Sequence, residues 1–230
     1  DPIENAAKVA ASADVAIVFA GTNSNLESEG RDRDGLELPG KQEALVKAVA
    51  KANKNTIVVV NSGCPINVSS WIKEVKALVN MYFIGQETGN AIASVLMGDV
   101  NPSGKLPFTY IANAKQSPAF EGYKKSLKVE YKEGVFVGYK FLEKNNMEPA
   151  YPFGFGLSYT SFAYSNLKVK ELAKNTYEVS VDVTNTGARS GDEVVQLYLS
   201  DKECSVARPV KELKGFSRVS LKAGETKTVS

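Results

Sequence analysis

The chain has 230 residues, of which 43% are hydrophobic and 23% charged, and its formal net charge at pH 7 is +2. This length fits one large or two small domains, and so mild a charge without a basic run argues against a nucleic-acid or anionic-membrane partner. No apolar stretch approaches the roughly 18 residues of a membrane span. The chain contains no histidine, which excludes a Ser–His–Asp triad, a Cys–His pair and His-ligated zinc. Any acid–base chemistry must come from carboxylates, Lys, Tyr or Cys.

The first hundred residues alternate between helix-like and strand-like segments. Apolar residues recur with a helical period over 3–13 and 42–53. Residues 14–21 and 56–63 are short β-branched runs ending in glycine, a pattern typical of strands buried on both faces of a parallel sheet. Further elements are predicted in the order helix, strand and helix: 69–75, 77–84 and 87–99. This order indicates an α/β domain in which helices sandwich a mainly parallel sheet.

The second half of the chain has a different character. A Pro/Gly-rich stretch over 98–110 leads into residues 112–150, which are irregular and rich in Lys and Tyr, with 127–143 compatible with a hairpin. The pattern then becomes all-β, with alternating strands predicted over 162–172, 176–187, 192–201, 212–222 and 225–230. Five strands at this spacing suggest an immunoglobulin-like sandwich, which needs about seven. We therefore expect a smaller all-β domain that is incomplete.

One loop concentrates charge. The stretch "NLESEGRDRDGLELPGKQ", Asn25 to Gln42, follows the first predicted strand. By its charge pattern alone it is compatible with a salt-bridged surface loop. Its place after a buried parallel strand favours a ligand site, because open α/β sheets bind ligands at the carboxyl ends of their strands. The loops "NSGCP" and "IGQETG" follow the next two strands, so we expect three loops to converge at one edge of the sheet.

Several stretches, taken in order, resemble a known family. Together they are similar to the C-terminal part of glycoside hydrolases of family 3, of the β-glucosidase/β-xylosidase type. The ordered set is "ESEGRDRDGLELPGKQ", "VVVNSGCPINVSSW", "IGQETGNAIASVLMGDVNPSGKLPFTY", "YKEGVFVGYKF", "EPAYPFGFGLSYTSFAYS", "VTNTGARSGDEVVQLYLSD" and "RPVKELKGFSRVSLKAGET". The resemblance implies an α/β sandwich domain over 1–111, a linker over 112–158 and a truncated fibronectin type III-like domain over 159–230.

The resemblance also implies a division of the chemistry. Family members carry an N-terminal (β/α)8 barrel whose aspartate is the nucleophile, usually in a Ser-Asp-Trp context, and no such tripeptide occurs here. The α/β domain supplies the general acid/base, which maps onto Glu29, with Glu27 as the alternative. Glu27, Arg31, Asp32 and Arg33 are expected to bind substrate. The residue after the glycine is aromatic in many members and is Arg31 here, which weakens any choice of sugar.

The assignment of Glu29 agrees with the requirements of the reaction. A retaining glycosidase needs two carboxyls about 5–5.5 Å apart, one to attack the anomeric carbon and one to protonate the leaving oxygen. The acid must keep its proton, although an isolated Glu has a pKa of about 4.3, and arginines pointing at it would lower its pKa further. We therefore expect Asp32 and Asp34 to pair with Arg31 and Arg33, or the arginines to turn to sugar hydroxyls.

The leading hypothesis is the acid/base-bearing part of a retaining exo-β-glycosidase that removes terminal β-D-glucosyl residues, inactive by itself. The alternatives are a β-xylosidase or arabinosidase of the same family, a non-catalytic carbohydrate-binding module, and a nucleotide-binding domain, which the absent phosphate loops disfavour. The expected partners are a β-linked oligosaccharide or an aryl or alkyl β-glycoside, and the barrel. No metal or cofactor is expected. An extracellular or periplasmic location is favoured over the cytoplasm.

Overall fold

The structure is a computed structural model that describes residues 1–30, 32–123 and 127–230. The chain divides into two compact units, and each is built from separate stretches of sequence. The first unit comprises Asp1–Ile92, Tyr110–Lys132 and Met147–Tyr151, and the second comprises Ala93–Thr109, Glu133–Asn146 and Pro152–Ser230. The predicted linker over 112–158 is thus shared between both units. The predicted domain boundaries at 111 and 158 stay a prediction.

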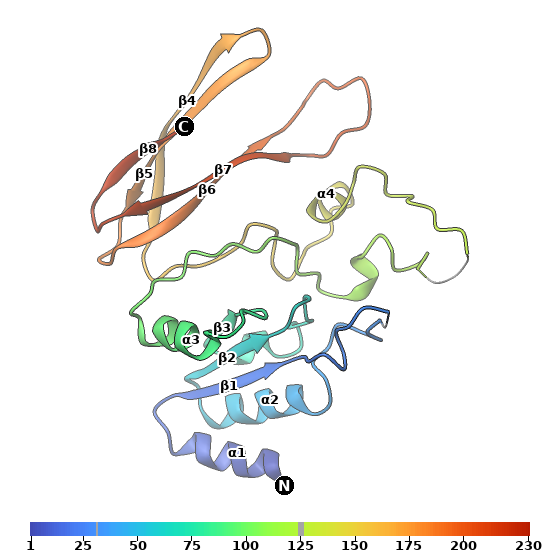
Figure 1. Cartoon of the computed structure of the whole chain (residues 1–230), viewed down its shortest axis with the longest axis vertical. Helices are drawn as coiled ribbons and strands as arrows, with labels where there is room; N and C mark the ends of the chain where they lie inside the picture. The colour runs from blue at the N-terminus through green and yellow to red at the C-terminus, as the bar shows by residue number, and fades with distance from the viewer. Residues whose placement is uncertain (31, 124–126) are drawn as a thin grey trace. The chain divides into compact units, whose positions relative to one another are not determined.

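The first unit contains the predicted parallel sheet. Its strands are β1 (Ala16–Gly21), β2 (Thr56–Asn61) and β3 (Ala77–Asn80), in the order β1-β2-β3 and all parallel. Gly21 lies beside Asn61 in the register, and Val60 beside Asn80. The three strands therefore end at one edge, and Figure 1 shows the arrows of β1 and β2 pointing toward the loops that follow them.

The helix α2 covers one face of this sheet, and α1 packs on α2. Figure 1 shows α2 (Gln42–Ala52) beside the sheet and α1 (Pro2–Ala11) on the outer side of α2. Val46 and Ala50 of α2 are fully buried, as the helical period predicts. The buried side chain of Asn53 donates to the carbonyl oxygens of Ala10 and Ala13 over 2.9 and 2.7 Å. These two bonds join the end of α2 to the end of α1.

The prediction that both strand runs are buried on both faces holds for β2 and is wrong for β1. Val58, Val59 and Val60 are at most 1% exposed, whereas Ile17 is 45% and Phe19 60% exposed. β1 lies at the end of the sheet order, and its burial alternates along the strand. Its alternate residues face α2, and within the described part of the chain the opposite face of β1 has no cover.

Two predicted elements are shorter than expected. The helix over 69–75 is a single 3₁₀ turn, Ile72–Glu74, because the buried Trp71 precedes it and Val75 is already extended. The strand over 77–84 stops at Asn80, since Tyr82 has a positive φ of 54° that ends the extended backbone. The third predicted helix is present as α3 (Thr88–Met97).

The segment 127–143 does not form a hairpin. Among its residues, all described, there is no strand, and the segment ends in the short helix α4 (Tyr139–Lys144). The alternation that suggested strands is interrupted at Gly134 and Gly138, whose φ angles of 57° and 62° turn the backbone. A short 3₁₀ turn, Ala114–Gln116, also lies in the region predicted to be irregular.

The second unit contains the five predicted strands of the all-β region. They are β4 (Phe162–Ala173), β5 (Thr176–Asn185), β6 (Gly191–Leu199), β7 (Glu212–Leu221) and β8 (Thr226–Val229). One antiparallel sheet has the order β4-β5-β8 and the other pairs β6 with β7. The two-sheet arrangement predicted for an immunoglobulin-like domain is confirmed.

A buried asparagine connects these two sheets. Asn185, at the end of β5, is 0% exposed, and its Nδ2 donates to the carbonyl oxygens of Arg189 and Leu221 over 2.8 and 3.1 Å. Its Oδ1 accepts from Thr160 Oγ1 and from the backbone N–H of Gly187. The amide thereby links the β5 end to the end of β7, and all of its hydrogen-bonding groups are used.

Other parts of the sandwich are open to solvent. Leu167, Val169 and Leu172 of β4 are 68%, 63% and 56% exposed. This agrees with a sandwich that has fewer strands than the seven or so of an immunoglobulin-like domain. The two cysteines, Cys64 and Cys204, are free and exposed. None of the described helices is long and apolar enough to cross a membrane.

Candidate active site

The charged loop is closed at its base by Gln42. The side-chain amide of Gln42, the first residue of α2, accepts from the Gly21 N–H over 2.7 Å and donates to the Gly21 carbonyl over 2.9 Å. The end of β1 is thus joined directly to the start of α2, and the loop between them leaves from one fixed point. Within the loop, Leu38 is buried and anchors the return toward α2.

Inside this loop, Glu27 is held from several directions. Its Oε1 accepts from Thr22 Oγ1 over 2.7 Å and lies 2.9 Å from Ser62 Oγ. Its Oε2 accepts from the backbone N–H of Gly63 over 2.9 Å. The guanidinium of Arg33 completes the set, with Nη1 3.3 Å from Glu27 Oε1. The Glu27 side chain is only 9% exposed, so its carboxylate is an internal part of the loop.

These contacts decide the protonation state of Glu27. Burial alone would raise the pKa of the carboxyl, but the bonds from Thr22, Ser62 and the Gly63 N–H, together with the Arg33 charge, outweigh it and lower the pKa below its usual value. Hydrogen bonds and a cation that favour the charged form have this effect in general. Glu27 is therefore an anion under conditions in which an ordinary glutamate begins to take up a proton.

Arg33 does not form the ion pair predicted from the sequence. Its described ion pair is with Glu27, whereas ion pairs of the arginines with Asp32 and Asp34 were expected. Arg33 also donates from Nη2 to the carbonyl oxygen of Glu37 over 3.2 Å and from Nη1 to that of Pro65 over 3.4 Å. The expected pairing with an aspartate was wrong for Arg33, because adjacent residues of an extended loop point different ways. The alternative, that the arginines turn to sugar hydroxyls, stays a prediction. Arg33 turns inward, whereas Asp32 and Asp34 are exposed.

Glu29 contrasts with Glu27 two residues earlier. It is exposed, and within the described part of the chain no side chain forms a hydrogen bond or ion pair with it. The next residue, Gly30, has a φ of 79°, a backbone conformation that side-chain-bearing residues resist. A carboxylate on such a turn remains available to a ligand.

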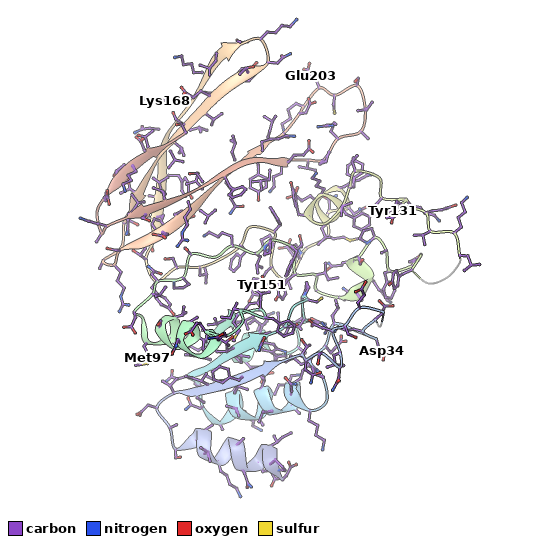
Figure 2. The ribbon with its side chains drawn as sticks, viewed as in Figure 1. Asp34, Met97, Tyr131, Tyr151, Lys168 and Glu203 are labelled. Atoms are coloured by element: carbon purple, nitrogen blue, oxygen red, sulfur yellow. The ribbon has the colours of Figure 1, made fainter. Side chains whose placement is uncertain are left out.

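Asp32 lies on the far side of the same turn. Its Oδ1 accepts from the hydroxyl of Tyr123 over 3.0 Å, which brings the stretch 110–132 to the charged loop. Asp34 is farther along the loop and exposed, and Figure 2 shows it at the outer end of the loop. Arg31, predicted to bind substrate, lies outside the described residues. Substrate binding by Glu27, Asp32 and Arg33 stays a prediction.

The expected convergence of three loops at one sheet edge is confirmed. The loop after β1 reaches the loop after β2 through Glu27 and Gly63. A Cβ at Gly63 would lie 3.0 Å from Phe83 Cε2, so the segment after β3 is adjacent as well. Asn67 in the second loop also donates to the Leu36 carbonyl over 2.7 Å. The carboxyl ends of the parallel strands therefore form one continuous surface, as expected of an α/β site.

The residues that hold this loop were not among the site residues predicted from the sequence. Thr22, Ser62 and Gly63 were not singled out, although each directly follows or ends a predicted strand. The small polar types and the glycine at strand ends were the available signal. A glycine at position 63 is required because a Cβ there would lie 2.7 Å from Glu27 Oε2. The pairing of Glu27 with Arg33 had no signal in the alternating charges.

Comparison with known proteins supplies the family. The model of the glycosyl hydrolase family 3 C-terminal domain matches residues 1–159, and that of the fibronectin type III-like domain matches residues 193–230.

The chain belongs to glycosyl hydrolase family 3.

Relatives in this family support the assignment over the full chain. The thermostable β-glucosidase B of Acetivibrio thermocellus is 46% identical over 232 residues, which cover 99% of this chain and 31% of that protein. The β-glucosidase of Kluyveromyces marxianus is also 46% identical, over 100% of this chain and 27% of its own length. The chain thus spans about a third or less of the length of these curated relatives.

Solved structures of family 3 have the same fold. The family 3 β-glucosidase of Bifidobacterium adolescentis aligns with a TM-score of 0.95 and 41% identity, covering 99% of this chain and 34% of that one. The Kluyveromyces marxianus β-glucosidase in complex with glucose aligns with a TM-score of 0.92 and 46% identity, covering 99% and 27%. The order of an α/β sheet followed by antiparallel sheets is therefore a family feature.

Proposed function

We propose that this chain is the acid/base-bearing part of a retaining β-glucosidase, with Glu29 as the general acid/base. The observation that carries the proposal is the difference in surroundings between the carboxylates of Glu27 and Glu29. Glu27 is buried, hydrogen-bonded and kept anionic, whereas Glu29 is exposed at a glycine turn beside the carboxyl ends of the strands. Only the second has a carboxyl free to exchange protons with a ligand.

The reaction needs a second carboxylate, for which the family resemblance implies an aspartate on a barrel outside these 230 residues. In the first step this aspartate attacks the anomeric carbon and the glycosidic bond breaks, while Glu29 gives its proton to the leaving oxygen. In the second step Glu29 takes a proton from water, whose oxygen attacks the anomeric carbon and releases the aspartate. The two displacements retain the anomeric configuration.

The proposed substrate is a β-D-glucoside. The support comes from the relatives, which are named β-glucosidases, and from a solved relative that is described as a complex with glucose. Arg31, which stands where many family members have an aromatic residue, leaves a β-xylosidase or arabinosidase as the alternative. The sugar is therefore tested together with the role of Glu29.

A chimera tests the proposal. These 230 residues would replace the matching segment of the Acetivibrio thermocellus enzyme, with which they share 46% identity. Aryl β-glucosides with activated (dinitrophenyl) and unactivated (phenyl) leaving groups would be compared with the matching xylosides. The control variant is Glu37→Gln, which neutralises another exposed carboxylate of the same loop.

The expected result is a chimera that prefers glucosides and that loses about 10²–10⁴-fold in kcat/KM on the phenyl glucoside after Glu29→Gln. On the dinitrophenyl glucoside the loss in kcat/KM should be much smaller, because that leaving group departs without a proton. Glu37→Gln should change neither rate. An active chimera in which Glu29→Gln affects both substrates equally and slightly would overturn the role of Glu29, and a preference for xylosides would overturn the sugar.

A further inference from the structure

The loop that carries Glu29 is fixed at one interior point, the carboxylate of Glu27. The groups within hydrogen-bond distance of it come from two loops: Thr22 and Arg33 from the loop after β1, and Ser62 and the Gly63 N–H from the loop after β2. The single proton of the Ser62 hydroxyl is shared between Glu27 Oε1 and the Cys64 carbonyl, 2.7 Å away. With the three other donors, it uses most of the acceptor capacity of the carboxylate. The side chain therefore joins the two loops and has little capacity left for a sugar hydroxyl.

Arg33 extends this joint to the end of the loop. Its guanidinium bonds Glu27 on one arm, the Glu37 carbonyl on the other and the Pro65 carbonyl in the second loop. Its side chain is 14% exposed, so the ion pair is screened from solvent on most sides. The planar fork of an arginine suits such a three-way contact, which a lysine would not reproduce.

The backbone around Glu27 is also tightly packed. A Cβ at Gly63 would lie 2.7 Å from Glu27 Oε2, 3.0 Å from Phe83 Cε2 and 3.1 Å from Phe83 Cδ2. The N–H of Gly63 reaches the carboxylate only because residue 63 has no side chain. The Glu27 carboxylate and the Phe83 ring therefore occupy the space that a side chain at residue 63 would need.

From this geometry we infer that Glu27 is the positioning residue of the acid/base loop, acting on the reaction through the placement of Glu29. The inference rests on the proposed function of Glu29. Glu29 follows Glu27 by two residues and precedes the turn at Gly30, and its own side chain is not held by any described residue. The place of Glu29 along the sheet edge is thus set by the carboxylate two residues earlier.

The first test measures loop order in this chain without any enzymatic assay. Amide hydrogen exchange of Asn67 reports on the joined loops, because its N–H bonds to the Leu36 carbonyl. Glu27→Gln removes the charge, and Gly63→Ala displaces the carboxylate without changing any charge. Each should speed exchange at Asn67 by about tenfold or more, while the amide of Val59 in β2 stays protected. Glu37→Gln is the matched control and should leave Asn67 unchanged.

The second test separates positioning from a merely structural or substrate-binding role. In the chimera, Glu27→Gln should lower kcat/KM on the phenyl glucoside far more than on the dinitrophenyl glucoside, as Glu29→Gln does. Added to Glu29→Gln, the Glu27→Gln change should cost little further, because residues that act through one group are not additive. An additive loss, or an Asn67 amide unaffected by both loop variants, would overturn the inference. If Glu27→Gln lowers kcat/KM on the phenyl glucoside while Glu29→Gln does not, the proposed function would be overturned instead.

Discussion

Glu27 and Arg33, six residues apart in one loop, form an ion pair of 3.3 Å whose side chains are 9% and 14% exposed. Two charges this well covered depend on each other, because removal of either partner leaves an uncompensated charge in a poorly hydrated place. The pair occupies the interior of a loop whose outer residues are charged as well. Its consequences can be measured both in the stability of this chain and in the catalysis of a complete enzyme.

Removing the arginine should be more harmful than removing both charges. Arg33→Met leaves the Glu27 carboxylate without its cation, and we expect a loss of about 2 kcal/mol in the free energy of unfolding. The double variant Arg33→Met with Glu27→Gln should recover part of that loss. Urea unfolding of the wild type, both single variants and the double variant would measure the coupling. A coupling of zero would show that the pair does not stabilise the loop.

The stability of the chain should depend on pH through Glu27. Its pKa in the folded state is lowered from the ordinary value of 4.5, so its contribution is fully present above that value and is lost as the pH falls through the lower folded pKa. The difference in unfolding free energy between the wild type and Glu27→Gln should therefore be constant near neutral pH and shrink in acid. A difference that grew as the pH fell below 4.5 would contradict this sign.

The all-β region should depend strongly on Asn185. Its side chain donates two hydrogen bonds and accepts two, and the residue is 0% exposed. Asn185→Ala would leave several backbone groups unpaired, at a cost of about 2–3 kcal/mol or more in the stability of the sandwich. Asn175→Gly is the control, because Asn175 is exposed at a turn with a φ of 61° that glycine adopts readily. Thermal unfolding followed by near-UV circular dichroism compares the two; equal midpoints would refute the role of Asn185.

Exchange rates should differ between the two compact units. The β2 residues Val58, Val59 and Val60 are at most 1% exposed, whereas Leu167 and Val169 of β4 are more than half exposed. Amides in poorly covered strands exchange through low-energy openings, so β4 should lose protection well before β2. Hydrogen exchange that found β4 as protected as β2 would contradict this expectation.

The regular elements of the fold could be predicted from the sequence because their signals are local. The apolar period of 42–53 marks the one buried face of a helix, and the β-branched run ending at Gly63 marks a strand buried on both faces, so α2 and β2 lie where expected. The prediction of a hairpin over 127–143 was wrong because pairing of two strands is not a local property. Its alternation is real, but Gly134 and Gly138 turn the backbone and the two halves belong to different compact units. A strand needs a partner, which alternation alone does not supply.

The candidate site was predictable in outline and not in detail. The position of a charged loop after a buried strand, with its resemblance to family 3, was sufficient to single out Glu29 and the sheet edge. The roles within the loop depended on which side chains turn inward, and a run of alternating charges does not encode that. Thr22, Ser62 and Gly63 from two strand ends bond the Glu27 carboxylate, and Arg33 pairs with this largely buried anion.

This chain without further polypeptide should hydrolyse no aryl β-glucoside at a measurable rate. A retaining mechanism needs two carboxyls about 5–5.5 Å apart, and the proposed nucleophile is not in this chain. The assay is turnover of the dinitrophenyl glucoside by the purified 230 residues, with the active chimera as the positive control. Hydrolysis by the chain alone, accompanied by a trapped glycosyl-enzyme, would show that its own residues include a nucleophile.

The most direct test of Glu29 as acid/base is rescue by azide in the chimera. In Glu29→Ala the second step stalls, because no base takes the proton from the attacking water, whereas azide is already an anion and attacks the anomeric carbon without a base. With the dinitrophenyl glucoside, added azide should restore turnover and yield β-glucosyl azide as the product. If azide neither speeds Glu29→Ala nor appears in the product, while the chimera itself is active, then Glu29 is not the acid/base.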